Sequence, residues 1–127
     1  MKKTVTKIKP VFEDNRGKIF DLLDTKKVKH IGIIESKNGS IRGNHFHRKS
    51  TQWTYVIEGK IRVYTKNVSD DKSEVEESIL NENDMIVIPP MIIHAVEALE
   101  DSKLLVLTDQ PRINNGYEYD TFKVKIK

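Results

Sequence analysis

The sequence predicts an all-β fold. Short runs rich in valine, isoleucine, threonine and tyrosine, separated by turn-forming residues, make up most of the 127 residues, and such runs favour strands. No apolar pattern with the helical period persists for three turns, so helix is expected to be a minor component. Many short strands in a chain of this length indicate a sandwich or a barrel.

The expected strands follow one another closely along the chain. They cover residues 4–12, 18–23, 29–35, 41–47, 52–58, 60–67, 74–80, 85–88, 94–98 and 103–108. Each is a run of β-branched, aromatic and other apolar residues bounded by turn formers. Between the second and third strands, residues 22–28 are expected to hold one short helical turn, with Asp24 and Thr25 as caps.

The turns between these runs carry signals of their own. Asn38 and Gly39 both tolerate positive φ and predict a two-residue hairpin between 29–35 and 41–47. Glu58 and Gly59 predict a second hairpin in the same manner. The polar stretch 69–73 is expected to be an exposed loop tip before the strand at 74–80.

The hairpin at Gly59 assigns side chains to two faces, because residues alternate across a strand. The inward face is mainly apolar and carries Gln52, Thr54, Val56, Ile61, Val63 and Thr65. The opposite face carries Trp53, Tyr55, Ile57, Arg62 and Tyr64. This second face is too aromatic to be left in solvent, so we expect it to meet a second sheet or a second subunit.

Length and composition set the class of protein. The chain of 127 residues predicts a single domain, residues 1–127, with one hydrophobic core. The apolar fraction of 37% and the charged fraction of 32% are typical of a soluble globular protein. No apolar run approaches the length of a membrane helix and the start lacks a signal-peptide core, so we expect a cytoplasmic protein with no membrane partner.

Charge and cysteine content exclude several functions. The net charge of +3 comes from 22 basic and 19 acidic residues scattered through the chain, whereas nucleic-acid binding needs a concentrated basic stripe. We therefore expect no nucleic-acid partner. The chain has no cysteine, so thiolate chemistry is excluded and any metal would depend on imidazole and oxygen ligands.

Histidines in residues 42–47 (RGNHFH) indicate a functional site. His45 and His47 are two residues apart, so on a strand they point to the same side. If that strand lines a small barrel, both imidazoles face its cavity, and two other strands can bring Gln52 and His94 to the same place. A buried imidazole is costly unless it is hydrogen-bonded, metal-bound or used in chemistry.

These residues resemble the conserved motifs of the cupins. Residues 43–59, with His45, His47, Gln52 and a final glycine, are similar to the first cupin motif, and residues 83–94 (NDMIVIPPMIIH) are similar to the second, with its proline turn and terminal histidine. The resemblance implies a cupin jelly-roll barrel. Gln52 departs from the usual motif, which commonly has a carboxylate at this position.

Within the cupins, the sequence most resembles the nucleotide-sugar 3,4-ketoisomerases that act on dTDP-4-keto-6-deoxyglucose, and the related dTDP-4-dehydrorhamnose 3,5-epimerases. Those families share the Arg-Gly-x-His segment matched by residues 42–47, the glutamine matched by Gln52, and an Asp-x-Arg-Gly segment matched by residues 14–17. The ketoisomerases also have a segment similar to residues 90–94. The resemblance implies an isomerase or epimerase of polysaccharide biosynthesis whose substrate is a dTDP-4-keto-6-deoxyhexose.

The chemistry of that substrate suggests residue roles. We expect His45 to be the base that takes a proton next to the carbonyl, and His47 the acid that returns it through an enediol, with no cofactor required. Gln52 would hold the sugar or the developing oxyanion, and Arg42 would neutralise the diphosphate. Tyr117 or Tyr119 is expected over the mouth of the pocket.

Two other functions remain open besides metal-free proton transfer, and the first is that of a metal-dependent cupin enzyme. His45, His47, Gln52 and His94 supply three imidazoles and an amide oxygen, a set that suits Zn, Fe, Ni, Cu or Mn without selecting one of them. The other alternative is a non-catalytic sugar-binding cupin.

A homodimer is expected in each case. Small barrels protect exposed strand edges by pairing, and the face with Trp53 and Tyr55 needs cover. Residues 4–12 are the candidate for exchange between subunits.

Overall fold

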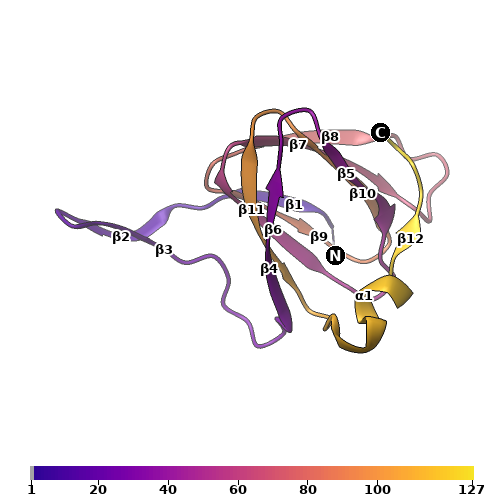
Figure 1. Ribbon diagram of the computed structural model, residues 1–127, viewed down its shortest axis with the longest axis horizontal. Coiled ribbons are helices and arrows are strands. Elements are labelled where there is room, and N and C mark those ends of the chain that lie inside the picture. Colours follow the sequence, from indigo (N-terminus) through magenta and orange to yellow (C-terminus); the bar gives the residue numbers. More distant parts are fainter. Residues whose placement is uncertain (1) are drawn as a thin grey trace.

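Two antiparallel sheets of five strands face each other in the computed structural model, which describes residues 2–127 (Figure 1). Sheet I has the order β1 (Thr4–Lys7), β9 (Asp84–Ile88), β6 (Gln52–Glu58), β11 (Ser102–Thr108) and β4 (His30–Ser36). Sheet II has the order β12 (Phe122–Lys123), β5 (Ile41–Phe46), β10 (Ile92–Ala98), β7 (Lys60–Asn67) and β8 (Glu76–Asn81). A separate hairpin is formed by β2 (Pro10–Asp14) and β3 (Gly17–Phe20).

From β4 onward the chain crosses from one sheet to the other at nearly every connection, as in a jelly roll. The prediction of an all-β jelly-roll fold is therefore confirmed. The expected barrel takes the form of a sandwich, because no ladder joins the two sheets within residues 2–127.

Both predicted hairpin turns are wrong. Asn38 and Gly39 connect β4 of sheet I to β5 of sheet II, and Glu58 and Gly59 connect β6 of sheet I to β7 of sheet II. Gly59 has a φ of 94° and passes so close to residues 101 and 102 that a Cβ would collide with their atoms. The glycine is thus required by a close backbone approach at a crossing between sheets rather than by a hairpin.

The face assignment made from that hairpin nevertheless agrees with the structure. The predicted inward residues other than Gln52 are buried, because both strands turn alternate side chains toward the space between the sheets. The core there consists of Val56, Ile61, Val63, Leu80, Ile86, Ile88, Leu104 and Val106. Gln52 is half-buried.

The aromatic outer face of sheet I is covered by the chain itself. Trp53 and Tyr55 pack with Met85 and Leu107, and the apolar side chains that cover them come from the N-terminal region: Ile8, Leu22, Leu23 and Val28. The expected second sheet or second subunit is therefore replaced at Trp53 and Tyr55 by a segment of the same chain. The helical turn expected at 22–28 is wrong, since that segment is irregular.

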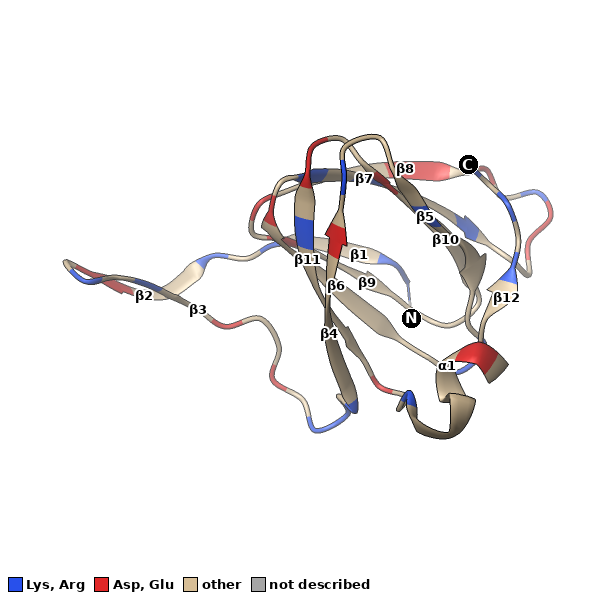
Figure 2. Ribbon diagram, viewed as in Figure 1, with Lys and Arg blue, Asp and Glu red and all other residues tan. Residues whose placement is uncertain are grey.

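The N- and C-terminal regions differ most from the prediction. The expected strand 4–12 is divided into β1, at the edge of sheet I, and β2, in the hairpin that projects from the body (Figure 1). Near the C-terminus, η1 (Ile113–Asn115) and α1 (Gly116–Tyr119) form a short helical segment that no pattern predicted. Acidic and basic residues are interspersed along the ribbon (Figure 2). No helix among residues 2–127 has the length and apolar character needed to cross a membrane.

Candidate active site

Neighbouring strands of sheet II bring two of the predicted histidines together. His45 on β5 lies opposite His94 on β10 in the ladder. A bulge follows at once, because β10 continues with Ala95 while the partner position on β5 moves from His45 to Gly43. Such a bulge bends the strand and changes where its side chains point.

The bulge depends on two residues with positive φ. Gly43 has a φ of 90°, and a Cβ there would lie 2.8 Å from the carbonyl oxygen of His94. Asn44 has a φ of 55°, a conformation that asparagine tolerates better than most residues. Its side-chain oxygen accepts hydrogen bonds from the backbone N–H groups of Ile126 (2.9 Å) and Lys127 (3.0 Å). The C-terminal tail is thereby attached to the strand that carries the histidines.

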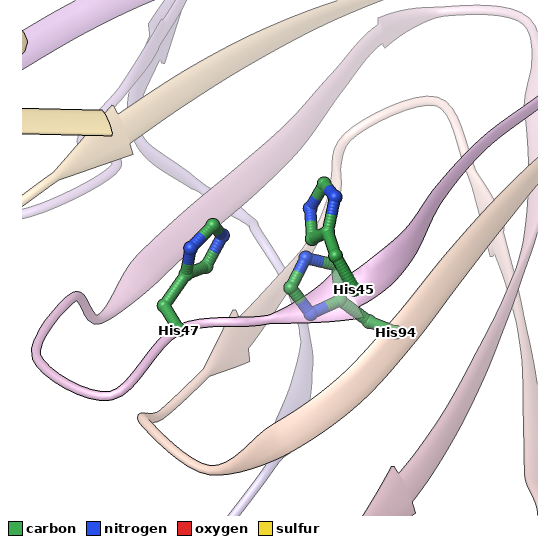
Figure 3. A group of neighbouring side chains, drawn as sticks. All are labelled: His45, His47 and His94. Carbon is green, nitrogen blue, oxygen red and sulfur yellow. The ribbon is translucent and has the colours of Figure 1, made fainter. Parts of the chain in front are cut away.

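The three imidazoles form one cluster (Figure 3). The ring centroid of His45 lies 4.9 Å from that of His47 and 4.7 Å from that of His94, and His47 and His94 are 5.4 Å apart. Phe46 turns to the other side and stacks on Phe122, with 5.3 Å between the ring centroids. The structure thus places His45 and His47 on one side of the strand and His94 beside them.

The cluster borders a cavity of about 330 Å³ between the sheets. Its apolar wall is formed by Ile34, Val96, Leu104 and Val106. His45, His94, Gln52, Thr54 and Tyr117 supply polar groups, and Arg42 and Arg112 supply positive charge. None of the described residues that line this cavity is acidic, so its environment favours an anionic ligand.

Hydrogen bonds fix the tautomers of two rings. His47 Nδ1 lies 2.8 Å from the carbonyl oxygen of Asp120, and His94 Nδ1 lies 3.1 Å from that of Ile92. A carbonyl oxygen can only accept, so each Nδ1 carries a hydrogen. His94 Nε2 is buried and has no partner among residues 2–127.

Burial keeps two of the rings neutral. Desolvation, and then the neighbouring His47 and Lys123, lower the pKa of His45 to about 4. Desolvation and the nearby His45 lower the pKa of His94 to about 3. At neutral pH both rings are uncharged and have a lone pair that can accept a proton or bind a metal ion.

Two polar residues flank the cavity. The amide nitrogen of Gln52 donates to Thr54 Oγ1 at 3.2 Å, which leaves its oxygen for another partner. The guanidinium of Arg42 donates to Ser36 Oγ (2.9 Å) and to the carbonyl of Glu35 (2.8 Å), and its side chain also lines a larger adjoining surface hollow.

The two candidate tyrosines have different positions. The ring of Tyr117 lies 6.3 Å from that of His45 and 5.7 Å from that of His47. Tyr119 is 77% exposed and does not line the cavity, because residues two apart on a helical turn point to roughly opposite sides. The structure brings Tyr117 to the site and leaves Tyr119 outside it.

Two further residues at the site were not predicted from the sequence. Arg112 places its guanidinium 4.1 Å from the centre of the Tyr117 ring and lines the cavity. Asp120 accepts the hydrogen bond from His47. Both belong to the C-terminal segment, where no regular pattern or recognised motif indicated a role.

Comparison with solved structures shows the same fold in sugar-nucleotide enzymes. A dTDP-4-dehydrorhamnose 3,5-epimerase from Sulfolobus tokodaii superposes with a TM-score of 0.79 at 20% identity, over 98% of this chain and 77% of that one. The sugar 3,4-ketoisomerase QdtA from Thermoanaerobacterium thermosaccharolyticum, in complex with TDP, superposes with a TM-score of 0.76 at 20% identity. The match covers 95% of this chain and 87% of that one. A 3,4-ketoisomerase from Helicobacter canadensis superposes with a TM-score of 0.73 at 25% identity, and the match covers 94% of each chain.

The sequence comparisons give the family. No curated protein matches the chain. Residues 12–122 match the family described as polysaccharide biosynthesis C-terminal domain. That match includes both histidine motifs, the two sheets except β1 and the last residue of β12, and the C-terminal segment with Tyr117 and Asp120. Together with the structural likeness, it confirms the resemblance to sugar-nucleotide ketoisomerases and epimerases: the chain belongs to the polysaccharide biosynthesis C-terminal domain family.

Proposed function

We propose that the protein is a sugar-nucleotide ketoisomerase or epimerase that moves a proton on a dTDP-4-keto-6-deoxyhexose. The observation that carries this proposal is a cluster of three imidazoles, of which His45 and His94 are held neutral by burial and line the cavity. The described residues in the lining of that cavity include two arginines and no carboxylate. The likeness to the ketoisomerase from Helicobacter canadensis, which extends over nearly the whole of both chains, supports the proposal.

The arginines suit the anionic part of such a substrate. The arginine ion pairs within residues 2–127 involve Arg16 and Arg62, so Arg42 and Arg112 have their charge available for a ligand. A guanidinium donates two parallel hydrogen bonds to phosphate oxygens. We therefore assign the diphosphate to Arg42, as the sequence suggested, with Arg112 as a second contact.

The histidines suit the sugar. His45, neutral and beside the cavity, takes the proton from the carbon next to the keto group, and the electron pair of that C–H bond forms the double bond of an enediol. The hydroxyl proton on that first carbon passes to Nε2 of His47, whose ring centroid lies 4.9 Å from that of His45, and from there to the former keto carbon. The carbonyl thereby forms on the first carbon, and His45 returns its proton to the former keto oxygen. The amide of Gln52 stabilises the oxyanion that develops between these two steps. No cofactor takes part in this sequence.

Proton exchange tests the proposal. Protein treated with EDTA is incubated with dTDP-4-keto-6-deoxyglucose in D₂O, and the sugar is followed by NMR. We expect deuterium to enter at a carbon next to the keto group, and His45→Asn to reduce the rate by at least about 100-fold, the usual range for loss of a general base. Exchange by His45→Asn at the rate of the unmodified protein would reject His45 as the base.

A metal-dependent enzyme is the second candidate, and a specific observation favours it. Nitrogen atoms of His45, His47 and His94 all lie within 4.8 Å of one another, and His94 Nε2 is buried with no hydrogen-bond partner among the described residues, 2–127. These three rings fit a divalent ion by type and spacing. Gln52, which lines the same cavity as His45 and His94, would be the candidate for a fourth ligand. Such an ion would polarise the sugar carbonyl as a Lewis acid. One tightly bound ion per chain, with exchange that stops when EDTA removes it, would favour this candidate over the first.

We also propose a homodimer. The β2–β3 hairpin projects from the body (Figure 1), and two strands alone are at best marginally stable in water. Its exposed apolar side chains and those on the outer face of β4 need cover, which a second copy can supply. Within this chain β1 pairs with β9 of the same sheet, and exchange of residues 4–12 stays a prediction. The hairpin, which includes residues 10–12 of that segment, is the element that we propose to contact the second copy. The cytoplasmic location stays a prediction from the sequence.

A further inference from the structure

We infer that Asp120 is a positioning residue that fixes the tautomer and the place of the His47 ring. The inference rests on the proposed function for its catalytic consequence, but its structural content is independent of the substrate. Asp120 immediately follows α1, touches neither the substrate nor a reacting atom in the proposed mechanism, and acts through His47.

The Asp120 carboxylate is unusual because backbone groups are its partners. It is 8% exposed, and no lysine or arginine within residues 2–127 forms an ion pair with it. Instead it accepts hydrogen bonds from the N–H groups of Arg48 (2.9 Å), Lys49 (3.1 and 3.2 Å) and Ser50 (3.0 Å). Three consecutive amides aimed at one carboxylate form an anion-binding nest, and bonds to a charged acceptor are stronger than neutral ones.

The nest begins directly after His47. Arg48 is the next residue along the chain, so the carboxylate holds the loop at the point where it leaves the histidine. Asp109 continues this arrangement by accepting the N–H of Thr51 at 2.8 Å. The backbone on the C-terminal side of His47 is therefore held by two buried or half-buried carboxylates from distant parts of the sequence.

The main chain of Asp120 holds the ring itself. Its carbonyl oxygen accepts the Nδ1 hydrogen of His47 at 2.8 Å. One residue thus fixes both the loop that carries the ring and the tautomer of the ring, and it leaves Nε2 free to accept or deliver a proton. Without this partner the imidazole can take either tautomer and can turn about its side-chain bonds.

The same residue also terminates the turn that carries Tyr117. The N–H of Asp120 donates to the carbonyl of Tyr117 at 3.2 Å, and the Tyr117 ring lies 5.7 Å from that of His47. Loss of the carboxylate bonds is therefore expected to loosen the contact of the C-terminal segment with the histidine cluster. Sequence patterns miss this role because it is performed through backbone atoms of a segment with no periodicity.

The test uses Asp120→Asn and Asp120→Ala in the full chain, with Glu118→Gln as matched control. Glu118 is an exposed carboxylate on the same turn, and its side chain forms none of the hydrogen bonds found within residues 2–127. Asparagine keeps one oxygen but points an N–H₂ group at the amide donors, and alanine removes both oxygens. Far-ultraviolet circular dichroism and thermal unfolding establish which variants fold.

The first measurement is the ¹⁵N shift pattern of the histidine rings after EDTA treatment. We expect one Nδ1–H tautomer for His47 in the unmodified protein and in Glu118→Gln, and a mixture of tautomers or a broadened signal in both Asp120 variants. An unchanged single tautomer in both variants would overturn the inference. So would a loss of folding in both, because Asp120 would then be a residue of general structural importance.

The second measurement is steady-state kinetics on dTDP-4-keto-6-deoxyglucose. We expect kcat to fall by about 10- to 100-fold, as for other groups that orient an imidazole, while KM changes much less. A fall in kcat equal in Glu118→Gln and the Asp120 variants would contradict the assignment. If the unmodified protein has no activity, the proposed function fails, and the tautomer measurement still decides the role of Asp120.

Discussion

At the scale of single residues, the site depends on imidazoles that folding keeps neutral. His45 and His94 have pKa values of about 4 and about 3 in the folded chain, against an ordinary value of 6.5. In the unfolded chain each imidazole takes up its proton at a higher pH than in the folded chain. This difference links the protonation of the site to the stability of the whole domain.

Stability should therefore fall on mild acidification. For a group with a depressed pKa, the unfolded state binds the proton first, so stability is fully present above pH 6.5 and is lost as the pH falls from 6.5 toward about 4. We expect a lower urea midpoint at about pH 5 than at about pH 7.5, a range in which most carboxylates stay ionised.

Two histidine variants test which imidazole causes this loss of stability. His30 also has a lowered pKa, through partial burial and then Arg112, and contributes in the same direction. His94→Asn should therefore show a smaller pH dependence than the unmodified protein, and His30→Gln a dependence reduced less. An equal midpoint at both pH values for the unmodified protein would contradict the neutral state of His45 and His94.

Sequence alone indicated part of this site. The two-residue spacing of His45 and His47 was sufficient to place them on one side of a strand, and the resemblance to the second cupin motif indicated His94. Arg112 and Asp120 were missed because they act from an irregular segment, Asp120 partly through its backbone carbonyl. Tyr119 was included because the sequence does not predict the short helical turn at its position, and this turn points the Tyr119 side chain into solvent.

At the scale of elements, the bulge in β5 is the feature that places His45 opposite His94. It requires Asn44 in a left-handed conformation, and the Asn44 side chain also holds the C-terminal tail. The bulge was not apparent from the sequence, which shows an ordinary strand run at 41–47.

Substitution of Asn44 separates its two contributions. Asn44→Gly keeps the backbone conformation and loses the two tail hydrogen bonds, which should cost about 1 kcal/mol of unfolding free energy. Asn44→Ala loses the same bonds and adds the strain of an alanine at positive φ, about 1 kcal/mol more. Urea unfolding measures both. Equal stability of the alanine variant and the unmodified protein would mean that the bulge does not depend on this residue.

Strand runs were more predictable than their connections. The runs at 52–58 and 60–67 correspond to β6 and β7, since composition and alternation are local properties of the chain. Whether Gly59 makes a hairpin or a crossing between sheets depends on contacts with residues 101 and 102, which are distant in sequence. The inward face was assigned correctly because alternation is the same in either arrangement.

At the scale of the whole molecule, the projecting hairpin indicates that one chain is not the complete assembly. Val11, Phe12 and Ile19 on the hairpin are 60%, 50% and 55% exposed. Ile31 and Ile33 on edge strand β4 are 60% and 62% exposed. Apolar side chains gathered on an isolated hairpin and on an edge strand are typical of surfaces that meet a partner.

Light scattering should therefore give a mass about twice the 14.7 kDa of one chain. Replacing Val11 and Phe12 together by serine should shift the protein toward the monomer, because it removes apolar contact area from the hairpin. Lys18→Ser, on the same hairpin but polar, is the control and should leave the dimer intact. A monomeric unmodified protein would contradict the proposed dimer.

Binding of a sugar nucleotide in the cavity beside the histidines is best tested by a crystal structure of the protein with dTDP. We expect the diphosphate within hydrogen-bond distance of Arg42 or Arg112, with its free end directed toward His45. Nucleotide bound elsewhere on the molecule, or no nucleotide in crystals soaked at millimolar dTDP, would contradict it.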